Sequence, residues 1–555
     1  MVMCMESIIK GKCIDYTYDG KGVIKVDNEV IFVDNVLINE EVEVRIRKKE
    51  KNYSIGEVVN YITTSKERKE PSCPYFYDCG GCHLLHMSYI EQLRFKENHV
   101  QNCIQRIGGI DKKVLPIIGM DKPYKYRNKV QVSFSKDYKG QVIGGFYKEK
   151  THQIIDNERC LLENEIAEEI ITFFKKLIVK YDIEPFDRSS NYGTIRHLLV
   201  RTGYYPKEVM VVIITKSKYL PKQKELIKEL TSKFPNIKSI IHNINEGKTN
   251  HILGNIEKCI YGKDYIEDTL CGLKFKISSK SFYQVNPTQT ERLYMEAINA
   301  AKLTKEDNII DAYSGIGTIG LIASKYVHSV VGVEIVKEAI INAQNNLKIN
   351  NITNAKYYVD DASRFMMNYI KDNKADVVFV DPPRNGLEKK FVEALLTSKP
   401  PKVIYISCDP SSLSRDLKML KEVYEIESIQ PVDMFPNTYH VETVVLLSHK
   451  DSNKHINVKV DFDTQEGKQF LDEIIENVNS RKPVERASYP EIKEYILNKY
   501  NVKVSTLNIA QIKAKYGIIE RECYNKPKNE NPRQPKCTKE KEELIVDALK
   551  HFEMI

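Results

Sequence analysis

The 555-residue chain contains no tryptophan, and none of its apolar stretches is long enough to form a membrane span. A transmembrane helix needs about 20 predominantly apolar residues, so we expect no membrane partner. The first residues, Met-Val-Met-Cys-Met-Glu-Ser, lack the charged and then apolar pattern of a secretory signal. Together these absences predict a cytoplasmic protein.

The chain also lacks a large excess of charge, because 84 lysines and arginines against 76 acids leave a net charge of +8. A balance of this size permits nucleic-acid binding without requiring it. The length predicts three or four domains rather than one core. In a reducing cytoplasm, the 12 cysteines are expected to be metal ligands or catalytic groups rather than disulfides.

Residues 1–62 predict a small β domain. Short alternating stretches at 20–26, 30–33 and 42–49 favour a five-stranded barrel of the oligonucleotide-binding kind. A basic strip in this domain could meet RNA phosphates, and solvated charges on an edge strand explain it equally well. The strip comprises Arg45, Arg47, Lys48, Lys49 and Lys51. The stretch resembles a TRAM domain, an RNA-binding module of tRNA- and rRNA-modifying enzymes.

A cysteine cluster follows the β domain: Cys73, Cys79 and Cys82, with two glycines between the last pair. Glycines let the backbone turn tightly enough for thiolates to converge, so the pattern predicts a metal site with Cys160 as the fourth ligand. Cys103 lies in a helical pattern and is interpreted as a core residue. Zinc and an iron–sulfur cluster both accept four thiolates, and the wide spacing between the first two cysteines favours iron–sulfur.

The rest of this region predicts a helix at 87–107 and then a mixed α/β domain. Basic and aromatic residues alternate at 122–129, a pattern compatible with gripping an RNA loop.

A βαβ pattern begins near residue 303, and acids stand at its strand ends. Asp311 precedes a glycine-rich turn, Glu334 ends the second strand, Asp360 and Asp361 follow the third, and Asp381 ends the fourth. This Rossmann-like layout admits a dinucleotide or S-adenosylmethionine. Acids facing the pocket would repel a pyrophosphate and suit a sulfonium, so we predict S-adenosylmethionine. Glu334 would bind its ribose and Asp361, or else Asp360, its adenine amino group. One of these acids could instead only cap a helix.

Cys408 follows an apolar strand, where open α/β sheets place working residues. Carbon 5 of a pyrimidine is a poor nucleophile until a thiolate adds to carbon 6, and a base must later remove the proton at carbon 5. Cys408 and Glu442 match these two needs. The motif that begins at Asp381 continues Pro-Pro-Arg384, whereas enzymes that methylate exocyclic amines typically have an aromatic residue in the last position. The alternatives are a buried structural cysteine and a solvated strand-edge carboxylate.

Residues 1 to about 450 resemble the RNA uracil-5-methyltransferases that carry a TRAM domain and a 4Fe–4S cluster and act on large-subunit (23S) ribosomal RNA. The resemblance implies that Cys408 is the nucleophile and Glu442 the base. Asp409 and Thr318 stand where the family usually has asparagine. The matching motifs are the four cysteines, Ser281-Phe-Tyr-Gln-Val-Asn286, Tyr313-Ser-Gly-Ile-Gly317, Asp381-Pro-Pro-Arg-Asn-Gly386, Ser407-Cys-Asp-Pro410 and His440-Val-Glu-Thr443. The implied cofactor contacts are Gln284, Tyr313, Glu334 and Asp381, and the implied cluster ligands are Cys73, Cys79, Cys82 and Cys160.

The sequence therefore predicts a monomeric, multi-domain chain that makes 5-methyluridine in 23S rRNA. The predicted parts are a TRAM OB-like β-barrel (1–62), a central α/β iron–sulfur and RNA-binding domain (63–283), a Rossmann-like S-adenosylmethionine-dependent methyltransferase domain (284–450), and a helical C-terminal extension of unassigned role (451–555). The alternatives are a tRNA uracil-5-methyltransferase and a catalytically silent iron–sulfur RNA-binding protein.

In the C-terminal extension, helices are predicted at 470–478, 489–500, 507–516 and 539–552. A helix-turn-helix-like pair would point Lys513 and Lys515 toward phosphates. The alternative is a helical tail packed on the catalytic domain.

Overall fold

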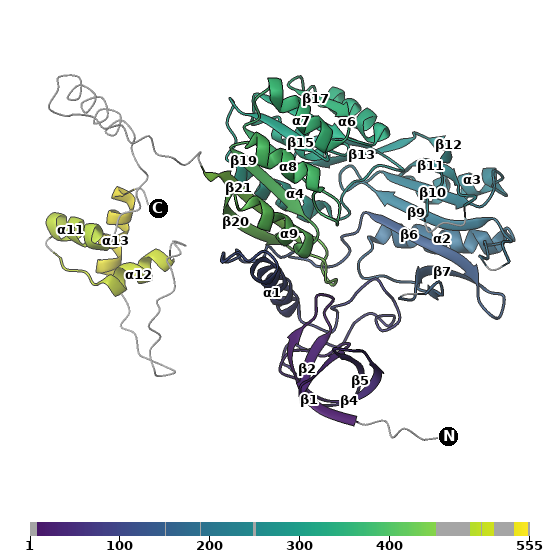
Figure 1. Ribbon diagram of the computed structural model, residues 1–555, viewed down its shortest axis with the longest axis horizontal. Coiled ribbons are helices and arrows are strands. Elements are labelled where there is room, and N and C mark those ends of the chain that lie inside the picture. Colours follow the sequence, from purple (N-terminus) through teal and green to yellow (C-terminus); the bar gives the residue numbers. More distant parts are fainter. Residues whose placement is uncertain are drawn as a thin grey trace. The chain divides into compact units, whose positions relative to one another are not determined.

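The computed structural model describes residues 8–149, 151–188, 190–247, 251–450, 489–500, 502–515 and 538–552. Contacts divide the chain into two compact units, Met1–Lys454 and His455–Ile555, whose elements are labelled in Figure 1. Among the described residues, no helix combines the length and apolarity needed to cross a membrane. The predicted helix at 470–478 lies outside the described residues.

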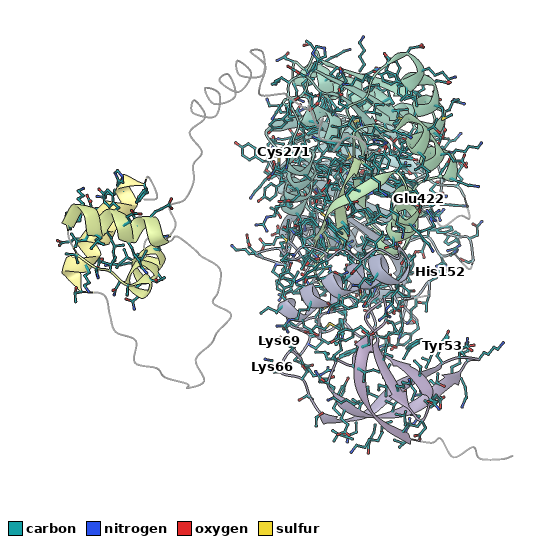
Figure 2. All side chains as sticks on the ribbon, turned by 60° about the vertical axis from the view of Figure 1, so that its left-hand side comes forward. Tyr53, Lys66, Lys69, His152, Cys271 and Glu422 are labelled. Carbon is teal, nitrogen blue, oxygen red and sulfur yellow. The ribbon has the colours of Figure 1, made fainter. Side chains whose placement is uncertain are left out.

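The first unit begins with a closed five-stranded barrel, as the sequence predicts. Its strands are β1 (Ile8–Tyr16), β2 (Gly22–Val26), β3 (Glu29–Val33), β4 (Glu41–Lys49) and β5 (Ser54–Thr63), in the order β1-β2-β3-β5-β4. Alternate side chains fill the interior, among them Cys13, Ile24, Ile31 and Val42. Tyr53, beside β5, stacks at a tilt on Phe32 (Figure 2).

Closure of the barrel corrects one interpretation of the basic strip. β4 pairs with β5 from Glu41 to Lys49, but with β1 only from Glu41 to Arg45. Among the described residues, Arg45 is therefore the member of the strip that does not lie on an edge. Four residues of the strip form ion pairs with acids of the barrel. Arg45 and Arg47 pair with Glu57, Lys48 pairs with Glu50, and Lys49 pairs with Glu29. Surface pairs of this kind contribute about 0–1 kcal/mol each, so they leave these cations available to other anions.

The central part of the first unit is a seven-stranded sheet in the order β12-β11-β10-β9-β6-β7-β8. Helix α1 (Tyr89–Arg106) precedes it, starting at Ser88, whose hydroxyl accepts from the Glu91 N–H at 3.2 Å. The sheet strands are β6 (Lys129–Lys136), β7 (Val142–Tyr147), β8 (Ile154–Asp156), β9 (Ile195–Thr202), β10 (Val209–Thr215), β11 (Ile237–Ile244) and β12 (Ile256–Gly262). The helices are α2 (Glu165–Lys180) and α3 (Gln223–Lys233), and the hairpin β13 (Tyr265–Leu270) and β14 (Leu273–Ser278) follows.

The last part of the first unit is a second seven-stranded sheet, in the order β17-β16-β15-β18-β19-β21-β20. The first five strands in this order are parallel and β21 is antiparallel to β19. The elements are α4 (Pro287–Ala301), β15 (Asn308–Ala312), α5 (Thr318–Ala323), β16 (Ser329–Glu334), α6 (Lys337–Ile349), β17 (Ala355–Val359), α7 (Ala362–Asp372), β18 (Val377–Val380), α8 (Lys389–Ser398), β19 (Lys402–Ser407), α9 (Pro410–Leu420), β20 (Tyr424–Val432) and β21 (Glu442–His449).

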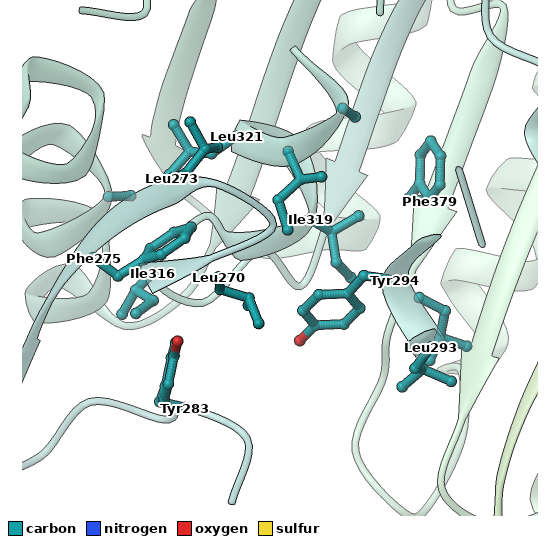
Figure 3. Close-up of a cluster of buried hydrophobic side chains, with 14 of the residues drawn as sticks. Leu270, Leu273, Phe275, Tyr283, Leu293, Tyr294, Ile316, Ile319, Leu321 and Phe379 are labelled. Atoms are coloured by element: carbon teal, nitrogen blue, oxygen red, sulfur yellow. The ribbon is translucent and has the colours of Figure 1, made fainter. Parts of the chain in front are cut away.

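This sheet has the Rossmann-like order that the sequence predicts. The chain leaves β15 toward β16 on one side and later returns to β18 on the other, which creates a switch point between β15 and β18, the usual place for a ligand in an open α/β sheet. A large apolar core supports this region, where Tyr294 of α4 packs near Ile319 of α5 and Phe379 of β18 (Figure 3).

The second unit contains three described helices: α11 (Tyr489–Tyr500), α12 (Thr506–Lys515) and α13 (Lys539–His551). They share a small core that includes Ile492, Ile496, Ile509, Ile512 and Leu549. Lys513 is only 2% exposed, and Lys515 pairs with Glu542. The prediction that both lysines point toward phosphates is therefore wrong for Lys513, which the helix packing buries.

Candidate active site

The predicted cofactor residues lie at one edge of the catalytic sheet because the strand register brings them there. Ala312 of β15 is level with Val333 of β16 and with Val380 of β18. The next residue along each strand is Tyr313, Glu334 and Asp381, respectively. The sheet thus places an aromatic residue between two acids at its carboxyl edge, beside the switch point between β15 and β18.

The glycine-rich turn after β15 fixes two of the acids. The Gly315 N–H donates to Glu334 Oε2 at 3.1 Å, and the Gly320 N–H donates to Asp311 Oδ2 at 2.9 Å. Gly317 has a φ of +82°, and a Cβ there would lie 2.8 Å from the Tyr357 ring. Only glycine meets both demands without strain, so the turn can pass close above the sheet.

Asp361 and Gln284 lie just before the helices α7 and α4, respectively. Asp361 caps α7, since its carboxylate accepts from the Arg364 N–H at 2.9 Å, and its charge helps to raise the pKa of Tyr313 after the larger effect of burial. Asp361 thus caps α7 through one carboxylate oxygen, and its charge also acts on Tyr313 at the pocket. Gln284 is buried just before α4, and its carbonyl accepts from Asn128 Nδ2 at 3.1 Å.

Cys408 and Glu442 meet across two antiparallel strands. Ser407 of β19 is level with Thr443 of β21, so the next residue beyond this pair is Cys408 on one strand and Glu442 on the other. Because β21 runs opposite to β19, its first residue reaches the same edge as the ends of the parallel strands. The site therefore contains a thiol and a carboxyl group 34 positions apart in the sequence.

Burial dominates the electrostatics of this pair. Burial and the nearby acids Glu442 and Asp381 raise the pKa of Cys408 to about 12, while Arg384 acts in the opposite direction. Burial and Asp381 raise the pKa of Glu442 to about 8, again opposed by Arg384. Both shifts favour the protonated form in the free protein, and each group must lose its proton before it can act as nucleophile or base.

Two further acids share this environment. Burial raises the pKa of Asp311 and of Asp381 to about 7. A pocket that forces carboxylates to hold protons attracts a cation, because a nearby positive charge would let them ionise. The pocket thus has the chemistry of a site for a cationic ligand.

Tyr294 is a residue of this site that the sequence did not indicate. Its pKa is raised by burial and then by the charges of Asp381, Glu442 and Asp311, which places its ring among the acids. It comes from the buried face of α4, where an aromatic residue has no motif around it and is most often core. No signal in the sequence separates it from its apolar neighbours.

The four predicted metal-ligating cysteines line one cavity in the central part of the unit. The cavity has a volume of about 330 Å³ and is bordered by Cys73, Cys79, Cys82 and Cys160. All four thiols are free. Burial and the neighbouring cysteines raise the pKa of Cys82, and burial and Glu163 raise the pKa of Cys160 to about 12.

Polar atoms around this cavity lack partners within the chain. Arg127 Nε, Asn157 Oδ1 and Glu163 Oε1 are buried without a hydrogen bond, which is costly unless something else satisfies them. In the described part of the chain, no three His, Cys, Asp or Glu side chains form a group that could hold a metal ion. The cysteines are thus gathered around a shared space without converging on one point.

Comparison with known proteins shows which family has this sequence and architecture. A family model described as tRNA (uracil-5-)-methyltransferase matches residues 88–450. An uncharacterized RNA methyltransferase of Clostridium tetani is 45% identical over 437 residues, 78% of this chain and 95% of that protein. An uncharacterized RNA methyltransferase of Staphylococcus aureus is 41% identical over 80% of this chain and 100% of that protein.

Among solved structures, a Pyrococcus abyssi tRNA (uracil-54, C5)-methyltransferase in complex with S-adenosyl-L-homocysteine is similar to this chain. It is 28% identical, with a TM-score of 0.63, and the match covers 79% of this chain and 100% of that chain. The region that the family model matches contains the acidic strand ends, Cys408 and Glu442. The chain therefore belongs to the tRNA (uracil-5-)-methyltransferase family, whose members are S-adenosylmethionine-dependent RNA methyltransferases.

Proposed function

We propose that the protein methylates carbon 5 of a uridine in 23S rRNA through a covalent bond between Cys408 and carbon 6 of the uracil. The observation that carries this proposal is the register of β19 and β21, which aligns Ser407 with Thr443 and so brings the neighbouring Cys408 and Glu442 to the same edge of the sheet. A family member that only bound RNA would have no use for a thiol and a carboxyl group at one rung of the sheet.

The thiolate of Cys408 adds to carbon 6 and turns carbon 5 into an enolate-like nucleophile. S-adenosylmethionine, when bound, supplies an electrophilic methyl group on a sulfonium. Carbon 5 takes this methyl group and then carries both the methyl group and its original proton. The Glu442 carboxylate removes that proton, and the released electron pair reforms the ring double bond and expels the Cys408 thiolate.

The same pocket fits the cofactor. Glu334 is held by the Gly315 N–H at the end of β16, the position from which an acid reaches a ribose. Asp381 and Asp311 supply negative charge once a sulfonium is near. Tyr313, Asp361 and Gln284 complete the proposed contacts, with Asp361 toward the adenine amino group.

The substrate RNA is the point at which two candidates differ. The resemblance to enzymes that act on 23S rRNA favours ribosomal RNA. The family description, tRNA (uracil-5-)-methyltransferase, and the Pyrococcus abyssi enzyme favour tRNA. Since that enzyme aligns over 79% of this chain, a tRNA is the second candidate.

RNA that contains 5-fluorouridine tests the reaction and the substrate together. Methyl transfer would proceed, but fluorine cannot leave as a proton, so the enzyme should stay bound to the RNA on a denaturing gel. We expect this adduct with 23S rRNA fragments, and only with Cys408 and S-adenosylmethionine present. An adduct with tRNA alone would favour the second candidate, and no adduct with either RNA would contradict the mechanism and leave a silent RNA-binding protein.

We also propose that Cys73, Cys79, Cys82 and Cys160 hold a 4Fe–4S cluster. The shared cavity of about 330 Å³ fits a group larger than a single ion, and iron–sulfur clusters in proteins are held by cysteine thiolates. Protein purified without oxygen should contain iron and acid-labile sulfide in equal amounts, lost together in Cys→Ser variants. Stoichiometric zinc without sulfide would contradict this assignment.

A further inference from the structure

The loop between β20 and β21, residues 433–441, is a buried connection that leads directly into Glu442. Asp433 is 0% exposed, and Asn437 and Thr438 are each 1% exposed. Connecting loops normally run over the surface, because buried backbone groups must find partners. The partners of this loop come from segments far away in the sequence.

Asn437 is the centre of these contacts. Its backbone N–H donates to Gln92 Oε1 at 3.0 Å, and its side chain accepts from Gln92 Nε2 at 3.2 Å. Its Nδ2 donates to the Pro123 carbonyl at 2.7 Å. Its carbonyl accepts from the N–H groups of His83 and Leu84 at 2.9 and 3.1 Å. Every polar group of Asn437 is therefore used, although its φ of +67° is one that few residues adopt.

A buried ion pair fixes the start of the same loop. Lys96 of α1 and Asp433 are both 0% exposed and pair with each other, and Lys96 also donates to the Phe435 carbonyl at 3.0 Å. Tyr89, also on α1, donates to the second carboxylate oxygen of Asp433 at 2.8 Å. Because an unpaired buried charge is costly, α1 and the loop are held in one arrangement.

We propose that Asn437 and Gln92 are positioning residues for Glu442. This inference rests on the proposed function, because it concerns the step in which Glu442 removes the proton from carbon 5. Cys408 directly follows β19 and is not attached to this loop, whereas Glu442 begins β21 directly after it. Loosening the loop therefore moves the base and leaves the nucleophile in place. Methyl transfer continues, proton removal slows, and the methylated RNA stays attached to Cys408.

The test counts two events in the same single-turnover reaction. RNA carrying tritium at uridine carbon 5 reports proton removal, and S-adenosylmethionine with a ¹⁴C-methyl group reports methyl transfer. The wild-type enzyme should release one tritium for each methyl group transferred. Asn437→Ala should lower the rate of tritium release by about 10- to 100-fold relative to methyl transfer, the scale expected when a catalytic group is displaced by about 1 Å. A methylated covalent adduct should accumulate.

Two further variants separate positioning from general loss of structure. Gln92→Met keeps Asn437 but removes its partner on α1, and we expect a smaller change of about 3- to 10-fold in the same direction. Asn351→Ala is the matched control, because Asn351 is also left-handed, with a φ of +54°, but is exposed and lies between α6 and β17. Asn351→Ala should still release one tritium for each methyl group transferred.

The inference is overturned if Asn437→Ala lowers methyl transfer and tritium release in the same proportion. If Asn437→Ala does not fold, the ratio of tritium release to methyl transfer in Gln92→Met tests the inference instead. A wild-type enzyme that neither transfers a methyl group nor releases tritium would instead show that the proposed function has failed, and the inference would fall with it.

Discussion

The active-site pocket and the cysteine cavity lie in the same compact unit and gather chemically reactive groups by different means. In the pocket, strand register brings Tyr313, Glu334 and Asp381 to one level and sets Cys408 opposite Glu442. In the cavity, the thiols come from connections outside the strands, and Arg127, Asn157 and Glu163 border them with unpaired polar atoms. The pocket is thus shaped by the sheet itself, whereas the cavity has polar groups that need something else to satisfy them.

This difference indicates that Cys408 of the pocket and the four cysteines of the cavity have separable roles. A substitution in the pocket should remove chemistry and spare the fold, and a substitution in the cavity should do the reverse. The following experiments challenge that separation, beginning with the largest expected effect.

Replacing Cys408 with serine should lower kcat/KM for RNA methylation by at least about 10⁴-fold, because a hydroxyl cannot replace the thiolate as nucleophile. Thermal stability and S-adenosylmethionine binding should change little. Cys271→Ser is the matched control, since Cys271 is a partly exposed thiol at the β13–β14 turn (Figure 2). If Cys408→Ser kept wild-type activity, the thiol could not be the nucleophile.

Replacing Glu442 with glutamine should slow release of the methylated RNA by about 10²- to 10⁴-fold, the usual contribution of a general base. The glutamine keeps the shape of the side chain but cannot take the proton, so a methylated adduct should be trapped on a denaturing gel. Free turnover by Glu442→Gln would assign the base elsewhere.

The affinity for S-adenosylmethionine should rise with pH. The pKa values of Asp311 and Asp381 are raised to about 7 by burial, and a bound cation favours their ionised form, so binding releases protons. The association constant should increase by up to about tenfold per pH unit, for each proton released, below pH 7 and level off above it. S-adenosylhomocysteine, which lacks the positive sulfur, should show a weaker dependence in calorimetry. Equal slopes for the two ligands would contradict the assignment.

The raised pKa values of Asp311 and Asp381 also determine how the stability of the protein depends on pH. A carboxyl group with a raised pKa binds more protons in the folded state than in the unfolded state. The free protein should therefore lose stability as pH rises from about 4 through about 7, on the order of 4 kcal/mol for each such group.

Replacing Cys73 with serine should have the smallest effect on chemistry. It should lower the free energy of unfolding of the protein purified without oxygen by about 1–3 kcal/mol, while the ratio of tritium release to methyl transfer stays within about twofold of wild type. Cys259→Ser, outside the cavity, is the control for loss of a thiol. A selective loss of methyl transfer in Cys73→Ser would break the separation between the two sites.

The sequence predicts local features of the site better than distant ones. An apolar run followed by an acid is enough to place Asp311, Glu334 and Asp381 at strand ends, and Cys408 follows the same rule. The meeting of Cys408 with Glu442 depends on β21 inserting between β19 and β20, which no local pattern encodes. Tyr294 and Asn437 were missed for the same reason, since their partners are distant in the sequence. The sequence predicts a surface position for Lys513, because lysine side chains are rarely buried.

The antiparallel rung between β19 and β21 also bears on how the chain can change over evolution. Helix α9, strand β20 and the loop after it all lie between Cys408 and Glu442 in the sequence, yet the distance between the two reacting groups depends on a single step across the sheet. Insertions in the turn after α9, at the exposed Glu422, would lengthen the chain without separating nucleophile from base. A one-residue slip of β21 would turn Glu442 to the opposite face, so variation should be tolerated in the length of this segment and not in its pairing.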